Sequence, residues 1–87
     1  MRLINEYTPP TPEDLENLKS ELGYTGTQMA DLAGVASNSQ WRKYTGGSEP
    51  RAMSSHILFF IAAKLSLSTN ELDRIVGKMK KIGAVII

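Results

Sequence analysis

Residues 25–44 limit most narrowly what this 87-residue chain can fold into. Thr25 and Gln28 have the spacing of a capping box, in which a hydroxyl and an amide satisfy free backbone N–H groups at the start of a helix. Ser37 and Gln40 repeat that spacing twelve residues later. Two helix starts so close together leave room for only two short helices.

A turn separates the two predicted helices. Gly34 suits the left-handed residue that ends a helix, and Val35 follows it as a buried apolar residue. Trp41 and Tyr44 lie about 60° apart on a helical wheel and define the buried side of the second helix. We expect that helix to run from about residue 38 to 45 and to end at the glycines 46 and 47. The first of the two helices, which starts after Thr25, has its packed side at Met29, Ala30, Leu32 and Ala33.

Three further helices are predicted around this pair. Thr11, Pro12 and the acids after them open one at about residues 12–22, which Gly23 ends. A second covers about residues 53–65, and its middle, residues 57–63, is apolar nearly all round. A helix of that kind is enclosed or shared with a second subunit; we expect Phe60 to point inward and Phe59 toward a partner. A capping box at Ser68 and Glu71 opens the last helix, with core spacing at Leu72, Ile75, Val76, Met79 and Ile82.

These elements predict an all-α fold, a small bundle of four or five helices in one domain covering residues 1–87. The two ends of the chain have a different pattern. Residues 2–4 and the apolar tail 84–87 suit short β-strands that pair with each other or with a second chain. Frayed ends are the alternative, but burial is favoured because four exposed apolar residues promote aggregation.

Composition excludes several classes of protein. The chain has no cysteine and one histidine, so a disulfide framework, a thiolate metal site and a catalytic triad are not expected. We expect no cofactor and no enzymatic activity. The first residues lack the pattern of a signal peptide, and no segment approaches the roughly 20 apolar residues of a membrane span. A cytoplasmic protein without a membrane partner is therefore expected.

Charge is distributed unevenly. Residues 1–35 carry six acids against two basic residues, a net charge of −4, and residues 36–87 carry eight basic residues against three acids, a net charge of +5. A basic second part suits a module that presents one face to an anion.

The side of the helix 38–45 opposite Trp41 is basic and polar. Ser39, Arg42 and Lys43 cluster there, with Asn38 at the tip and Gln40 at the flank. Such side chains pair with base edges and phosphates in the major groove of DNA. Arg42 suits guanine, and Asn38 or Gln40 suits adenine. Phosphate contacts are predicted for Lys43 and Arg51.

The start of the preceding helix adds a candidate phosphate site. Free N–H groups around Gly26 and Thr27 favour an anion, and Gly26 has no side chain to obstruct it. Thr25, Thr27 and Gln28 add donors. The alternative, that Thr25 and Gln28 only cap the helix, is compatible with such a contact. Ser37 completes the predicted interface as the cap of the following helix.

Residues 11–67 resemble the Xre/Cro/phage-repressor family of helix-turn-helix regulators. Thr25, Met29 with Ala30, Gly34 with Val35, and Trp41 with Tyr44 carry the resemblance. It implies a lambda-repressor-like bundle whose third helix enters the major groove of double-stranded DNA, with Asn38, Ser39, Gln40, Arg42 and Lys43 as readers.

Two positions depart from the family pattern. Gly26 stands where Gln is usual, and the segment from Val35 to Tyr44 is one residue longer than is common. A subset of phage and mobile-element regulators, including small regulators that accompany anti-CRISPR genes, is similar in spacing. The extra residue leaves the exact reader positions open by one place.

The function predicted first is a transcriptional regulator, a repressor or autoregulator, that binds a two-fold operator as a homodimer. Its predicted dimer surface comprises the helix around residue 58 and the segment 68–87, with Leu58, Phe59, Val85 and Ile86 as contacts. The alternative is an antitoxin-like or adaptor module that binds another protein. Salt dependence of duplex binding discriminates the two.

Overall fold

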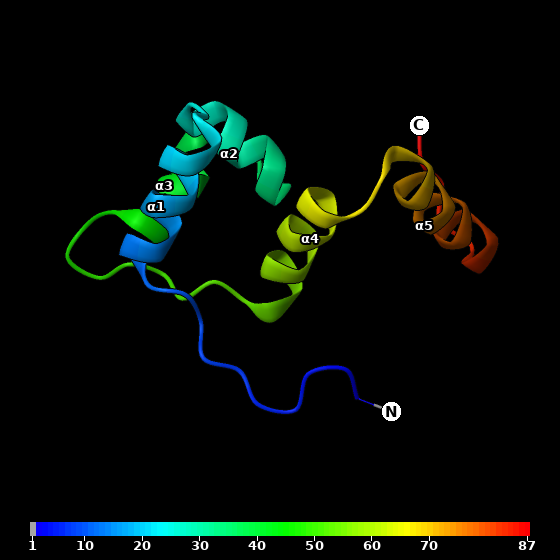
Figure 1. Ribbon diagram of the computed structural model, residues 1–87, viewed down its shortest axis with the longest axis horizontal. Coiled ribbons are helices and arrows are strands. Elements are labelled where there is room, and N and C mark those ends of the chain that lie inside the picture. Colours follow the sequence, from blue (N-terminus) through cyan, green and yellow to red (C-terminus); the bar gives the residue numbers. More distant parts are fainter. Residues whose placement is uncertain (1) are drawn as a thin grey trace.

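The computed structural model describes residues 2–87, which contain five α-helices and no strand. Figure 1 shows α1, α2 and α3 gathered at one end of the molecule, α4 in the middle and α5 at the other end. The predicted all-α class is confirmed. The helices are α1 Pro12–Leu22, α2 Gly26–Ala33, α3 Asn38–Thr45, α4 Ser55–Ser66 and α5 Thr69–Ile82.

Local capping determines the bounds of the first three helices, and the predicted bounds are confirmed. The Thr11 hydroxyl accepts a hydrogen bond from the Asp14 N–H at 3.1 Å, and the Asp14 carboxylate accepts one from the Thr11 N–H at 2.9 Å. The Thr11 backbone N–H lowers the pKa of Asp14 because it stabilises the charged carboxylate. Gly23 and Gly34 end α1 and α2 in the left-handed region, at φ 67° and 72°.

The fourth helix begins two residues later than predicted, at Ser55 instead of Met53. Ser54 is its cap, because the Ser54 hydroxyl accepts a hydrogen bond from the Ile57 N–H at 3.3 Å. Met53 precedes the helix and is almost fully buried. Its carbonyl accepts a hydrogen bond from the Tyr7 hydroxyl at 2.7 Å, which anchors the extended N-terminal segment beside α4.

The hydrophobic core comes from α1 to α4 and the loop before α4, and no buried residue belongs to α5. Trp41 of α3 and Met29 of α2 are the largest side chains at its centre. Burial of each such side chain stabilises the fold by about 1.5–3 kcal/mol. The core residues are Leu15, Met29, Ala30, Leu32, Ala33, Trp41, Tyr44, Met53 and Ile61.

A close contact joins α4 to the end of α2. The ring of Phe60 lies over Gly34, so closely that a Cβ at Gly34 would come 2.9 Å from Phe60 Cε2. Lys64 also lies over the Phe60 ring, with its Nζ 4.8 Å from the ring centroid. The same Nζ donates a hydrogen bond to the Asp31 carbonyl of α2 at 2.9 Å. The prediction that Phe60 points into the core is wrong: 46% of it is exposed, because it covers a helix end instead of entering the bundle.

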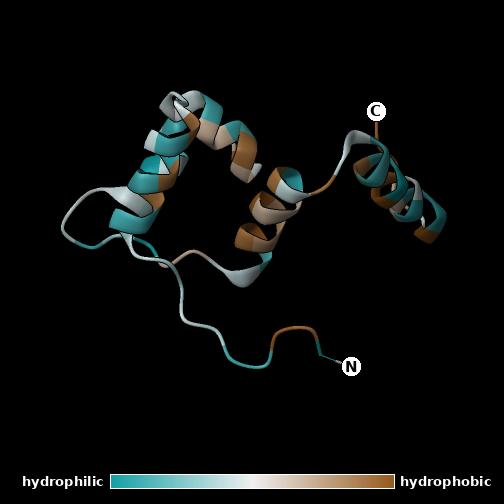
Figure 2. Cartoon of the chain, viewed as in Figure 1, coloured by the Kyte–Doolittle hydropathy of each residue, from teal (hydrophilic) through white to brown (hydrophobic). Residues whose placement is uncertain are grey.

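The apolar residues of α5 were predicted to belong to the core, and this prediction is wrong. They have core spacing, yet Ile75, Met79 and Ile82 are 43%, 46% and 77% exposed. Figure 2 shows brown apolar positions along both α4 and α5. Within residues 2–87, no helix combines the length and apolarity required to cross a membrane.

The predicted terminal strands are absent from the described residues. Residues 2–4 and 84–87 have no strand pairing, and Leu3 and Val85 are 69% and 90% exposed. The expectation of burial is therefore wrong within a single chain. Figure 1 shows the N-terminal segment ending below α4 and the tail ending above α5, so the two segments do not lie side by side as paired strands.

Candidate nucleic-acid interface

Two aromatic anchors determine which side of α3 faces outward. Trp41 and Tyr44 are 1% and 6% exposed, and their ring centroids lie 6.5 Å apart at a tilt of 54°. This arrangement matches the predicted inner face. The Trp41 indole N–H is buried without an acceptor among the described residues, so packing alone holds the ring.

The outer face of α3 carries the predicted polar surface. Ser39, Arg42 and Lys43 are all exposed, and Asn38 is exposed at the first position of the helix. An open groove runs along these side chains and continues over the loop between α3 and α4. The loop contributes Gly46, Gly47, Glu49 and Arg51 to the groove.

Arg51 reaches this groove through the backbone. The Arg51 N–H donates to the Lys43 carbonyl at 2.7 Å, which folds the loop back onto the end of α3. Gly47 permits the turn, because its φ of 83° lies in the left-handed region. The groove therefore contains three basic side chains, Arg42, Lys43 and Arg51, against the single acid Glu49. Sequence reasoning missed the lining role of Gly47 and Glu49, although the paired glycines indicated a tight return.

The cap of α3 is simpler than predicted. The Ser37 hydroxyl accepts a hydrogen bond from the Gln40 N–H at 3.3 Å. The reciprocal bond of a capping box does not form, in contrast to Thr25 and Gln28. The Gln40 side chain, which is half-buried, thus has no capping role at this helix.

The start of α2 has the complete capping box. The Thr25 N–H donates to Gln28 Oε1 at 2.8 Å, and the Gln28 N–H donates to the Thr25 hydroxyl at 3.2 Å. Both side-chain oxygens are therefore engaged at the helix end. Thr27, also exposed, takes no part in this cap. Capping by Thr25 and Gln28 is confirmed, and a phosphate contact there stays a prediction.

The side chain of Asn38 packs directly against Gly26. A Cβ at Gly26 would overlap the Asn38 side-chain oxygen, so the amide of Asn38 occupies the space that a side chain at residue 26 would fill. The sequence suggested that the space above Gly26 is free for an anion, but the Asn38 side chain occupies that space.

A second open groove lies on the other side of Asn38 and Arg42. It is lined from α1 by Glu16 and Lys19 and from the end of α3 by Thr45 and Gly46. Sequence reasoning missed the two α1 residues, since nothing in the local pattern places α1 beside α3. Arg42 borders both grooves and so occupies the centre of this surface.

The residues predicted for a dimer contact lie apart from this surface. Leu58 is half-buried and packs against the core of its own chain. Phe59 is 52% exposed and lines a depression with residues 2–4 of the N-terminal segment. In the tail, Val85 is 90% exposed and Ile86 36% exposed.

Comparisons of this chain with family models, with curated proteins and with solved structures find no match. The class that the fold defines is a small all-helical protein. Its function is therefore inferred from the surface of α3.

Proposed function

We propose that this chain is a sequence-specific regulator that binds double-stranded DNA and inserts α3 into the major groove. One observation carries the proposal: the outer face of α3 places Ser39, Arg42 and Lys43 in one open groove, and the loop adds Arg51 to it. A two-turn helix locked from behind by Trp41 and Tyr44 is rigid enough to present these groups in register.

Arg42 has the central role. It borders both grooves beside α3, and its guanidinium suits the paired acceptors of guanine. We propose that Asn38 and Gln40 are the candidates for adenine and that Ser39 contacts either a base or the backbone. Lys43 and Arg51, which are joined through their backbones, bind adjacent phosphates.

The arrangement of α2, the turn and α3 supports membership of the Xre/Cro/phage-repressor family, and with it a repressor or autoregulator that acts as a homodimer. A single helix of 8 residues reads only a few base pairs. Two copies on half-sites about 34 Å apart, or a multiple of that distance, provide useful specificity.

The test begins with selection of bound sites from random duplexes, which provides an operator. We expect Arg42→Ala to weaken specific binding by about 5- to 150-fold in affinity while the fold is kept. Gel-shift titration at fixed salt measures the affinity, and circular dichroism checks the fold. Arg74→Ala, the same change on α5 at the other end of the molecule, is the matched control. Unchanged operator affinity of Arg42→Ala would refute the assignment.

A second candidate function is favoured by the exposed apolar residues of α4 and α5. Phe59 and Met79 suit a protein partner, as in an antitoxin-like or adaptor module. The two functions differ in salt dependence. A DNA reader loses duplex affinity steeply between about 50 and 200 mM salt, whereas an adaptor binds no duplex with a sequence preference.

A further inference from the structure

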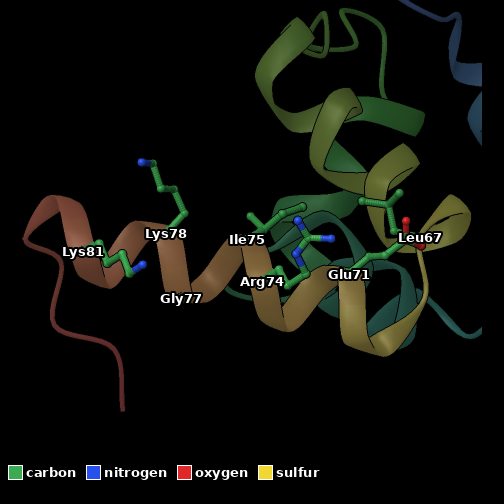
Figure 3. Close-up of a pocket in the computed structure, with 7 residues that line it drawn as sticks. All are labelled: Leu67, Glu71, Arg74, Ile75, Gly77, Lys78 and Lys81. Carbon is green, nitrogen blue, oxygen red and sulfur yellow. The ribbon is translucent and has the colours of Figure 1, made fainter.

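The fifth helix has an apolar face that its own chain covers only in part. Leu72, Ile75, Val76 and Met79 fall within an arc of about 100° on the helical wheel. Ile75 and Met79 are exposed and Leu72 and Val76 are half-buried, and α5 makes no extensive contact with α1 to α4. Figure 3 shows α5 projecting from the bundle after Leu67, with Ile75 beside the charged residues of the helix. A helix of 14 residues is marginal in water unless its apolar face is packed.

We infer that a second copy of this chain covers that face, with the two α5 helices antiparallel around a two-fold axis between Ile75 and Val76. The apolar positions are symmetric about that point. Leu72 then meets Met79 of the partner subunit, and Ile75 meets Val76 of the partner subunit. This inference names the dimer surface of the proposed regulator and rests on the proposed function only for what the dimer is used for.

Charge decides the orientation. Glu71 and Lys78 are seven residues apart, so they lie on one edge of the apolar face, and Asp73 and Lys80 lie on the other edge in the same way. Antiparallel pairing brings the acid of each edge within one turn of the basic residue on the matching edge of the partner. Parallel pairing would place acid opposite acid and lysine opposite lysine, which is destabilising. Antiparallel pairing also aligns the helix dipoles favourably.

The size of the surface predicts a weak dimer. A helix of 14 residues is about 21 Å long and about 10 Å wide. Its footprint, on the order of 200 Å², is small beside the roughly 800 Å² that each partner buries in a standard interface. The exposed tail after Gly83, with Val85 and Ile87 outward, adds apolar area directly next to α5. We therefore expect dissociation in the micromolar range, with the dimer strengthened further on DNA.

Sedimentation of the full chain without DNA tests the association. The unchanged chain should show a concentration-dependent monomer–dimer equilibrium. Ile75→Glu with Met79→Glu should weaken that equilibrium at least about 100-fold, because burying carboxylates opposes association. Gly77→Glu is the matched control: it adds the same group on the opposite side of α5, where a side chain meets open space, and should leave association unchanged.

A monomer at all concentrations up to about 1 mM would overturn the inference. In that case α5 packs on its own chain, on another protein or on a lipid surface. Thermal unfolding separates misfolding from lost association: the core contains no α5 residue, so the double variant should keep the melting transition of the α1–α4 bundle. Because no DNA is present, failure of DNA binding and failure of dimerisation are distinguishable.

Disulfide trapping tests the orientation, and the chain has no cysteine of its own. Leu72→Cys and Met79→Cys are made as separate variants, one of them with an affinity tag, and are mixed under a mild oxidant. The antiparallel pair predicts that covalent dimers joining one chain of each variant form faster than dimers of either variant alone. Faster linkage of Leu72→Cys to itself would overturn the orientation.

Discussion

At the scale of single residues, Gly26 and Asn38 form the contact that most directly shapes the proposed reading surface. The amide of Asn38 lies where a Cβ at Gly26 would be. A side chain at residue 26 therefore changes the position of Asn38, not the backbone of α2. Asn38 stands at the first turn of α3, where small displacements decide which base edge an amide can reach.

We expect Gly26→Ala to keep the fold and change the base preference. The added methyl displaces the flexible Asn38 side chain, while alanine costs less backbone entropy than glycine, so stability should change by no more than about 1 kcal/mol. Thermal unfolding and selection from random duplexes measure the two effects. Gly77→Ala, which makes the same exchange in α5, should leave the preference unchanged. A selected sequence identical to that of the unchanged chain would show that Asn38 reads no base.

At the scale of elements, each helix begins at a Ser or Thr whose hydroxyl accepts a backbone N–H within the same turn. The cap of α5 also carries a charge. The Glu71 carboxylate accepts the Ser68 N–H at 2.8 Å, and this bond lowers the pKa of Glu71 below 4.5. The free energy of α5 formation therefore depends on the ionised form of this exposed group.

The lowered pKa of Glu71 predicts the sign of a pH effect. Its contribution to folding is present above pH 4.5 and is lost as pH falls through the lower pKa of the folded state. Helix content should therefore fall in that acidic window. Glu71→Gln keeps an acceptor for the Ser68 N–H and removes the charge, so its titration by far-ultraviolet circular dichroism should be flatter. Asp14, whose pKa is lowered in the same way, contributes to the part that persists. Superimposable curves for both chains would contradict this role of Glu71.

At the scale of the whole molecule, α3 and α5 lie at opposite ends of a body 42 Å long (Figure 1). The proposed reading surface and the proposed dimer surface therefore do not compete for the same residues. This separation lets one chain bind DNA and its partner at the same time. It also means that the pairing of α5 determines how far apart the two α3 helices stand.

We expect binding to an operator with two half-sites to be tightest at one half-site spacing. The paired α5 helices hold the two α3 helices a fixed distance apart, and both must enter major grooves on the same side of the duplex, so affinity should fall when the spacing changes by a few base pairs. A series of duplexes with half-sites moved apart one base pair at a time measures this optimum. The variant with Ile75→Glu and Met79→Glu should bind each half-site alone and lose the optimum. Equal affinity at all spacings of the unchanged chain would argue for a monomeric reader.

The first three helices and the inner face of α3 were predictable because their causes are local. Thr11, Thr25 and Ser37 act within four residues, and Gly23 and Gly34 end helices by their own backbone conformation. The start of α4 was predicted wrongly for a reason that is also local. The apolar residue Met53 fits a helical pattern, but the hydroxyl that caps α4 belongs to Ser54.

By itself, the sequence determined the helix bounds around the turn, the buried side of α3 and the polar residues left on its outer face, because periodicity and capping need only neighbouring residues. Only the tertiary structure decided where Phe60 packs, that Asn38 covers Gly26, that the Arg51 N–H donates to the Lys43 carbonyl and that α5 contributes no residue to the core. These depend on contacts between distant segments. An apolar face predicts that something must cover it, but its pattern does not say which surface does.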